Sequence, residues 1–191
     1  MTVAERWTTD DLARFPDDDG LRYEIINGEL HVSKALGWYH QLVAGRIAQA
    51  LGNWNGVAGS GEVVSTPGII LTNEDNLIPD VIWISNERLA TALRPDGKLH
   101  ELPELIVEVL SPGPANIRRD RKDKLDVYAH HDVQEYWIVD WQQRTVEVYR
   151  RGEATLRLVE TLRTDDVLCS QLCHGFELAV GSLFVGVPRG G

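Results

Sequence analysis

The chain has 191 residues, of which 43% are hydrophobic and 25% charged, a composition typical of a globular protein with one sizeable core. Its net charge of -10 argues against a protein that binds nucleic acid non-specifically over its whole surface, because phosphate contacts require clustered lysine and arginine. No apolar run approaches membrane-spanning length and no signal-peptide core is present, so we expect a cytoplasmic protein without a membrane segment. The basic run at residues 118–124 is a local exception and, on charge alone, is typical of a solvated helix face.

The N-terminal third of the chain predicts a hairpin followed by a long helix. Asn27-Gly28 joins two runs of alternating polarity, and this dipeptide is the strongest short-range signal for a hairpin. Apolar residues then recur with the helical period over residues 36–54. We therefore predict an amphipathic helix there, with His40 one position off its apolar stripe.

The middle of the chain contains several residues that favour turns between its predicted elements. Residues 62–72 predict a strand that is broken at Pro67, and residues 73–76 predict a turn. Residues 86–99 are polar, and we expect them to be irregular.

The second half of the chain predicts a helix, a buried strand and an antiparallel pair of strands, in that order: residues 117–131, 135–140, 145–149 and 155–160. The pattern assigns no element to residues 167–187, and the role of the segment 165–191 stays open. Because we find no internal repeat or linker, we predict one α/β domain over residues 1–191.

Two further runs, residues 79–84 and 104–112, are short, apolar and rich in β-branched residues, which predicts strands buried on both faces. Each run nevertheless contains an acid, because Asp80 enters the first strand and Glu108 lies in the middle of the second. A buried carboxylate is costly unless it is paired, protonated or bound to a cation. Two such acids in neighbouring strands indicate a site for a hard divalent ion, which prefers oxygen ligands.

A lysine on the predicted helix completes this set. Lys124 borders the helix face that Leu125 and Tyr128 anchor, because these residues follow three- and four-residue spacing. Two acids with a lysine suit metal-dependent phosphodiester hydrolysis, in which the ion polarises a phosphoryl oxygen and generates hydroxide from bound water. The lysine would orient that water or neutralise the developing charge.

The ordered motifs together resemble the Uma-type restriction-endonuclease family of the PD-(D/E)XK nuclease superfamily, over roughly residues 23 to 149. They are Pro79-Asp80, Glu108-Val109-Leu110-Ser111-Pro112, Lys124 with Tyr128, and the run at residues 135–140. The resemblance implies an α/β, restriction-endonuclease-like fold. Its core would be a mixed β-sheet flanked by helices, with an N-terminal hairpin and a C-terminal antiparallel extension.

By this resemblance, Asp80 matches the Asp of the PD motif and Glu108 matches the acid of the (D/E)XK motif. The chain departs from the superfamily pattern at Leu110, where a lysine would stand, and Lys124 on the following helix is the match for that lysine. Glu24 and His40 match further polar positions of the family's pocket.

The resemblance implies a metal-dependent DNA endonuclease whose catalytic residues are Asp80, Glu108, Lys124 and Glu24, with His40 as a secondary candidate. Asp80 and Glu108 would hold Mg²⁺ or Mn²⁺. DNA would be the substrate, and a homodimer is expected by analogy, because cutting two strands requires two sites.

Each of these residues also has a structural interpretation. Asp80 would accept hydrogen bonds from backbone amides at the start of a strand, and Glu108 would be a buried acid paired with Arg118 or Lys124. Lys124 would be a surface lysine lying along Tyr128, and His40 would flank its helix without a ligand.

Two other functions remain open from the sequence. The first is a non-catalytic nucleic-acid-binding or protein-interaction module on the same fold, favoured by the net charge and by Leu110. The second is a metal-dependent hydrolase of another phosphoester, which the fold alone does not exclude. Cys169 and Cys173 lie four residues apart with no further cysteine, so we predict two buried, reduced thiols.

Overall fold

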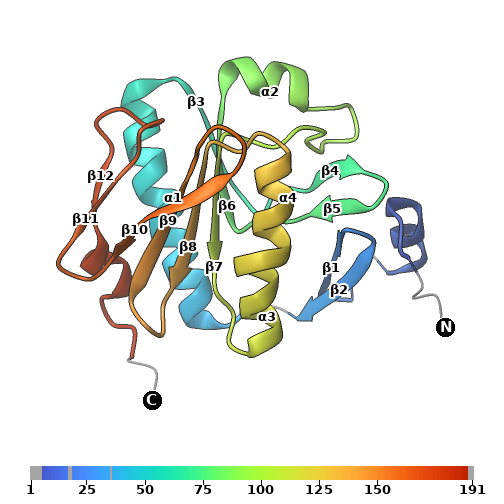
Figure 1. Ribbon diagram of the computed structural model, residues 1–191, viewed down its shortest axis with the longest axis horizontal. Helices are drawn as coiled ribbons and strands as arrows, with labels where there is room; N and C mark the ends of the chain where they lie inside the picture. Colours follow the sequence, from blue (N-terminus) through green and yellow to red (C-terminus); the bar gives the residue numbers. More distant parts are fainter. Residues whose placement is uncertain (1–5, 17–18, 35, 189–191) are drawn as a thin grey trace.

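The computed structural model describes residues 6–16, 19–34 and 36–188, and a six-stranded mixed sheet forms its centre (Figure 1). The strand order is β10-β9-β8-β7-β6-β3. Only β7 and β8 run parallel among these neighbours, and the other pairs are antiparallel. The strands are β3 (Gly61–Ser65), β6 (Val81–Ser85), β7 (Leu105–Val109), β8 (Glu135–Asp140), β9 (Thr145–Arg151) and β10 (Leu156–Leu162).

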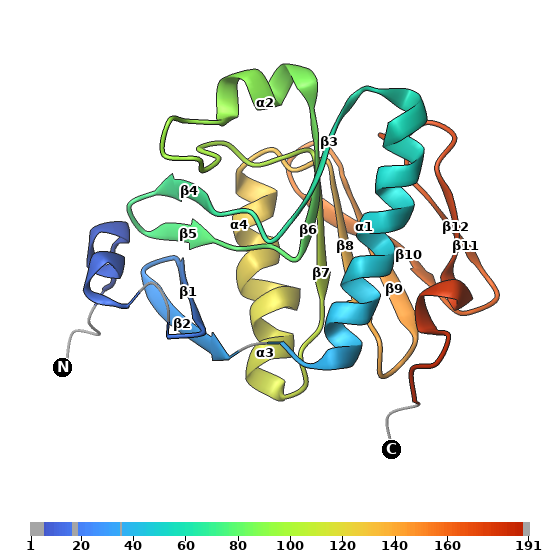
Figure 2. The ribbon, with the colours of Figure 1, turned by 180° about the vertical axis from the view of Figure 1, so that it is seen from behind.

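Helices cover both faces of this sheet (Figures 1 and 2). The long helix α1 (Trp38–Ala58) lies on one face. On the other face lies one continuous helix made of α3 (Pro114–Arg118), the π-helical segment η2 (Arg119–Lys124) and α4 (Leu125–His130). This helix is the crossover that the parallel pair β7 and β8 requires.

The central strands are buried on both faces because each side chain has a helix to pack against. Val107 and Trp137 belong to the core on the α1 face, and Ile106 and Ile138 belong to the core on the α4 face. All four side chains are 0% exposed. The predicted two-sided burial of these strands is therefore confirmed.

A second, four-stranded sheet holds the N-terminal hairpin, beside a short 3-10 helix η1 (Thr9–Arg14). Its order is β2-β1-β5-β4, with β1 (Leu21–Ile26), β2 (Glu29–Lys34), β4 (Ile69–Thr72) and β5 (Asp75–Leu77). Asn27 and Gly28 form the predicted turn, and both have positive φ, at 51° and 78°. That conformation is the one that a two-residue hairpin turn requires.

The chain first passes from the four-stranded to the six-stranded sheet through α1, and two further crossings lie close together. It leaves β3 through Thr66 and Pro67, and it returns through Asp80 into β6. The amide of Thr66 donates to the carbonyl of Asp80 at 3.0 Å, so the two crossings lie side by side. The break predicted at Pro67 is confirmed, and it separates strands of different sheets.

Two sequence predictions for polar segments were wrong. Residues 86–99 are not irregular throughout, because α2 (Asn86–Ala92) begins there with the Ser85 hydroxyl accepting from the Arg88 amide at 3.1 Å. The turn predicted at residues 73–76 is shorter, because β5 begins at Asp75, whose buried carboxylate accepts from the Asn27 amide at 2.9 Å.

The C-terminal extension contains β11 (Val167–Cys169), β12 (Glu177–Ala179) and the 3-10 helix η3 (Val180–Phe184), and it lies beside α1 (Figure 2). Cys169 is exposed, which corrects the expectation of two buried thiols, whereas Cys173 is buried and both are free. Alternation along β11 explains the exposure of Cys169, because Leu168 takes the inward position. In the described part of the chain, no helix is long and apolar enough to cross a membrane.

Candidate active site

A buried lysine joins two acids from different sheets. The Nζ atom of Lys124 lies 2.8 Å from Oε1 of Glu24, in β1, and 2.8 Å from Oε1 of Glu108, in β7. Lys124 is only 1% exposed, so these contacts are made away from bulk water. The structure thus brings together three of the four residues that the resemblance assigned to catalysis.

Glu108 has a second partner and a perturbed pKa. Its Oε1 atom also accepts a hydrogen bond from the hydroxyl of Tyr128 at 2.9 Å. Burial is the main cause that raises the pKa of Glu108 to about 8, and the charges of Asp80 and Asp120 add to it against the pull of Lys124.

The fourth residue, Asp80, lies against the backbone next to Glu108. Its Oδ2 atom accepts from the amide of Val109 at 2.8 Å and lies 3.1 Å from Nε2 of His40. Its Oδ1 atom lies 3.8 Å from Nη1 of Arg22. Burial opposes ionisation, but the contacts with His40 and with the Val109 amide hold the pKa of Asp80 below its ordinary value.

Strand geometry explains why these side chains meet. Val81 pairs with Val107 in the antiparallel pair of β6 and β7, and extending this register by one residue sets Asp80 opposite Glu108. Opposite residues of an antiparallel pair project on the same face. Residues two apart in a strand also share a face, so Arg22 and Glu24 both reach the group from β1.

Sequence reasoning missed a further ion pair, between the half-buried Arg119 and the buried Asp120. Asp120 is 1% exposed, and its Oδ1 atom accepts from Nε of Arg119 at 3.0 Å. Within the described residues, its buried Oδ2 atom has no hydrogen-bond partner. Burial raises the pKa of Asp120 despite the nearby charges of Lys124 and Arg119.

The π-helical turn Arg119–Lys124 explains how two charges of one helix point inward together. Residues four apart drift around an α-helix, and a wider turn brings them closer to alignment. The four-residue spacing of Asp120, Lys124 and Tyr128 was a signal in the sequence that could have identified Asp120. We call Glu24, Asp80, Glu108, Asp120 and Lys124 the charged cluster.

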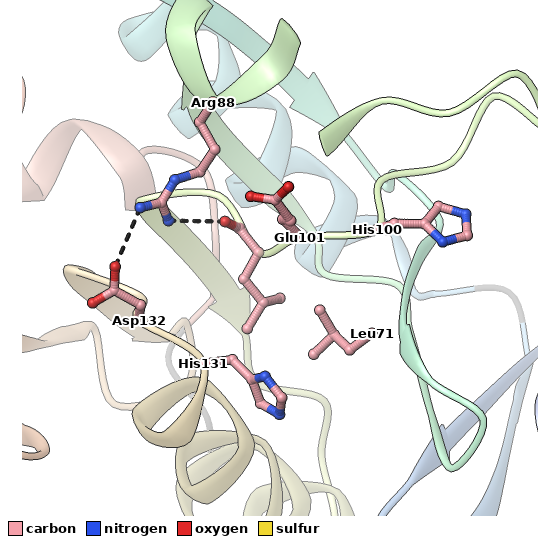
Figure 3. A pocket seen from close by; sticks show the side chains of 7 residues that line it. Leu71, Arg88, His100, Glu101, His131 and Asp132 are labelled. Atoms are coloured by element: carbon pink, nitrogen blue, oxygen red, sulfur yellow. Dashed lines mark hydrogen bonds and ion pairs between the residues drawn. The ribbon is translucent and has the colours of Figure 1, made fainter. Parts of the chain in front are cut away.

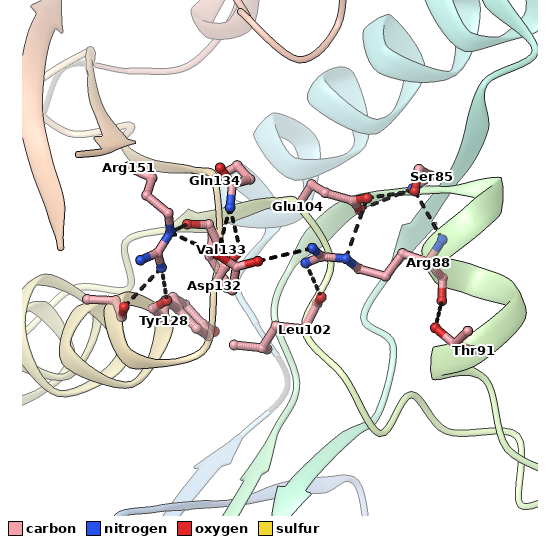
Figure 4. A network of polar contacts seen from close by, with 11 residues as sticks. Ser85, Arg88, Thr91, Leu102, Glu104, Tyr128, Asp132, Val133, Gln134 and Arg151 are labelled. Atoms are coloured by element: carbon pink, nitrogen blue, oxygen red, sulfur yellow. Dashed lines mark hydrogen bonds and ion pairs between the residues drawn. The ribbon is translucent and has the colours of Figure 1, made fainter. Parts of the chain in front are cut away.

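A polar network beyond the charged cluster fixes the helix that carries Tyr128 (Figure 4). The guanidinium of Arg151 donates to the carbonyls of Tyr128, Ala129 and Val133 at 3.2, 2.9 and 2.7 Å. Two of these bonds go to carbonyls at the end of α4, where helix carbonyls have no intrahelical partner. Asp132 in turn lies 3.5 Å from Arg151 and 3.3 Å from Arg88.

The structural interpretations of the sequence can now be compared with these contacts. Glu108 pairs with Lys124, and Arg118 lies instead 3.8 Å from Asp123. Lys124 is not a surface lysine, since it is almost fully buried. In the part of the chain that the structure describes, no three His, Cys, Asp or Glu side chains form a preformed metal cage.

Comparisons with known proteins give a family and, separately, a fold. The model of the Uma2 family, described as a putative restriction endonuclease, matches residues 9–181. The crystal structure of a putative nuclease belonging to DUF820 from Anabaena variabilis has a TM-score of 0.73 at 16% identity, over 93% of this chain and 97% of that one. This likeness shows a shared restriction-endonuclease-like fold.

A second solved structure, the type IIG restriction endonuclease BpuSI, has a TM-score of 0.38 at 15% identity, over 63% of this chain and 13% of that one. No curated protein matches the chain.

Proposed function

The chain belongs to the Uma2 family of putative restriction endonucleases, and from that premise we propose that it is a metal-dependent endonuclease that hydrolyses phosphodiester bonds of DNA. The observation that carries the proposal is the placement of Asp80 opposite Glu108 with the Lys124 ammonium on the second acid. Buried acids and lysines with perturbed pKa values, such as Glu108 and Lys124, are typical of active sites.

The two acids have donor atoms that suit a magnesium or manganese ion. In each carboxylate, one oxygen accepts the protein's hydrogen bonds, namely Oδ2 of Asp80 and Oε1 of Glu108. Magnesium is commonly bound through one or two carboxylates and keeps several waters, so a cage of three side chains is not needed. We propose that Asp80 and Glu108 hold Mg²⁺ or Mn²⁺, which would supply a Lewis acid and a water of lowered pKa.

The remaining residues would position charge around the reacting phosphate. Nearby acids raise the pKa of Lys124 despite its burial, so its ammonium stays charged and can neutralise the negative charge that develops on the phosphate. Glu24 would act on Lys124, which it holds at 2.8 Å, and His40 would act on Asp80. Both are positioning residues in this proposal.

We also propose that residues 1–191 form a single restriction-endonuclease-like domain that acts in the cytoplasm as a homodimer. The dimer rests on the need for two sites to cut two strands, and the family membership supports DNA as the substrate.

Nicking of supercoiled plasmid DNA with Mg²⁺ or Mn²⁺ tests the proposal. We expect wild type and the exposed control Glu62→Gln to nick, and Asp80→Asn and Glu108→Gln to be inactive. Calorimetric titration of Mn²⁺ should show binding to wild type and its loss in Asp80→Asn. Metal binding without any cleavage would point to another phosphoester. Absence of metal binding in wild type would point to a non-catalytic module.

A further inference from the structure

A hollow of about 280 Å³ lies between the end of the β1–β2 hairpin and the segment that follows β7. The residues of its wall that matter here are Ser33, Lys34, Gly37, Ser111, Asn116 and Arg119, and we call it the Lys34 hollow. We propose that this hollow binds a backbone phosphate of the DNA strand, next to the bond that is cut. The inference rests on the proposed nuclease function and names where its substrate is held.

Three residues of the Lys34 hollow lead to the charged cluster or its contacts. Ser33 pairs across the hairpin with Arg22, whose guanidinium lies 3.8 Å from Asp80. Ser111 follows Glu108 by three residues, and Arg119 is bonded to Asp120. A phosphate in this hollow would therefore lie beside the acids that are proposed to act on its neighbour.

The hollow is positive although the protein is acidic overall. Its wall contains the cations Lys34 and Arg119 and no acid among the described residues, in a chain of net charge -10. Lys34 is exposed, and Ser33 and Ser111 add hydroxyl donors. Lysine, arginine and serine are residues that commonly contact phosphate oxygens in DNA complexes.

Another hollow, near α2, shows what a wall unsuited to phosphate looks like (Figure 3). It also contains an arginine, Arg88, but Glu101 and Asp132 share its wall. The guanidinium of Arg88 already donates to the Leu102 carbonyl at 3.0 Å and to Asp132 at 3.3 Å (Figures 3 and 4). Arg119 of the Lys34 hollow is also paired with an acid, Asp120, but that acid does not line the hollow. Near α2, an incoming phosphate would meet two carboxylates in the wall itself.

Size supports a short stretch of backbone as the occupant of the Lys34 hollow. At about 280 Å³ it is smaller than most sites for drug-sized ligands, which begin near 300 Å³. A local cationic site is also needed on electrostatic grounds, because the buried acids and the net charge repel DNA.

Fluorescence anisotropy of a labelled DNA duplex with metal-free protein tests the hollow without cleavage. We expect Lys34→Gln to bind more weakly to two unrelated sequences alike, and to lower the slope of log affinity against log salt by about one. Lys98→Gln, the same charge change at an exposed residue away from the hollow, should keep the wild-type affinity and slope.

A steady-state measurement separates this inference from the nuclease proposal. In the nicking assay, Lys34→Gln should raise KM and leave kcat unchanged, because it removes binding energy common to ground and transition states. Equal affinity and slope for Lys34→Gln and Lys98→Gln would overturn the proposed phosphate site even if the protein cuts DNA. Loss of binding in Lys34→Gln would support it even if no cleavage is found. If the wild-type protein does not bind DNA, the assignment of a phosphate site to the Lys34 hollow is wrong.

Discussion

Glu108 and Glu135 are acids buried in the neighbouring parallel strands β7 and β8, and they differ in their hydrogen-bond partners. Both are nearly inaccessible, at 3% and 2% exposed. Glu135 accepts a hydrogen bond from four donors, two on each oxygen: Arg150 and the Gln171 amide on Oε1, and Trp137 and Ser170 on Oε2. This acid anchors the C-terminal extension to the central sheet.

Glu108 has a less complete set of partners. Both described donors, Lys124 and Tyr128, reach the same oxygen, Oε1. Its pKa is raised to about 8, chiefly by burial. The comparison teaches that burial alone does not identify a functional acid. Glu135 accepts hydrogen bonds on both oxygens, as suits an acid with a structural role. Among the described residues, Glu108 accepts on one oxygen only, and in our proposal the other is left for the metal ion.

The largest expected effect comes from breaking the Glu135 side of this comparison. Glu135→Ala leaves Arg150 and three further donors without their acceptor, and we expect it to lower the free energy of unfolding by about 3–5 kcal/mol. The control is Glu160→Ala, which removes the exposed partner of the same Arg150, at 2.9 Å, and should cost about 1 kcal/mol or less. Urea unfolding measures both. Equal losses would mean that the four hydrogen bonds carry no special stability.

Lys124→Met tests the Glu108 side of the comparison by measuring activity. Methionine fills the same buried space, and the loss of the ammonium should reduce cleavage by about 10²–10³ while Mn²⁺ binding is kept. Lys124→Arg should restore little, because the planar guanidinium does not replace a compact ammonium. Circular dichroism must show that the variants are folded, and Lys122→Met is the exposed control. Full activity of Lys124→Met, with Asp80→Asn inactive, would contradict the assignment of Lys124.

The pH dependence of the free energy of unfolding tests whether Glu108 is protonated in the folded protein. With a folded pKa of about 8 and an ordinary value of 4.5, Glu108 holds a proton in the folded state that the unfolded chain releases between these pH values. The free energy of unfolding should therefore fall as pH rises through this range, by at most about 1.4 kcal/mol per unit. Glu108→Gln cannot titrate and should show a flatter profile than wild type and Glu62→Gln. A steeper profile in Glu108→Gln would contradict the raised pKa.

The smallest expected effect is on thiol reactivity. Cys169 is exposed and should react quickly with a thiol reagent, whereas Cys173 is buried and should react slowly. Burial, as the main cause, raises the pKa of the Cys173 thiol to about 12. The amide of Cys173 donates at 3.1 Å to Ser170, a partner of Glu135. Cys173 should therefore react faster in Glu135→Ala, and Cys169→Ser should remove only the fast phase.

Local signals predicted much of the fold. Asn27-Gly28 and the helical period over residues 36–54 depend on neighbours in sequence, and the corresponding elements formed. The elements that sequence reasoning missed depend on distant partners. Asp75 is held by the Asn27 amide, 48 residues away, and Ser85 donates to Glu104 at 2.6 Å. Polar segments such as these have no apolar period from which a strand or helix could be predicted.

The candidate site shows the same division. Asp80 and Glu108 were noticeable because acids are unusual within apolar strands. Arg119 and Asp120 stand in a basic run that resembles a solvated helix face. The charge of Arg119 is favoured by Asp120, Glu24 and Glu108, and the charge of Asp120 is favoured by Lys124 and Arg119. Glu24 lies nearly a hundred residues earlier, so no pattern along the helix could reveal that compensation.

The π-helical segment Arg119–Lys124 holds one residue more than a regular α-helical turn would need. Each residue of an α-helix turns the chain by about 100°, so side chains three or four residues apart lie on the same face. Deleting one residue at 121–123, so that the segment closed into regular α-helix, would set Asp120 three residues before Lys124 and leave both charges on one face. The helix could therefore lose one residue at this turn and still direct both charges towards the same acids.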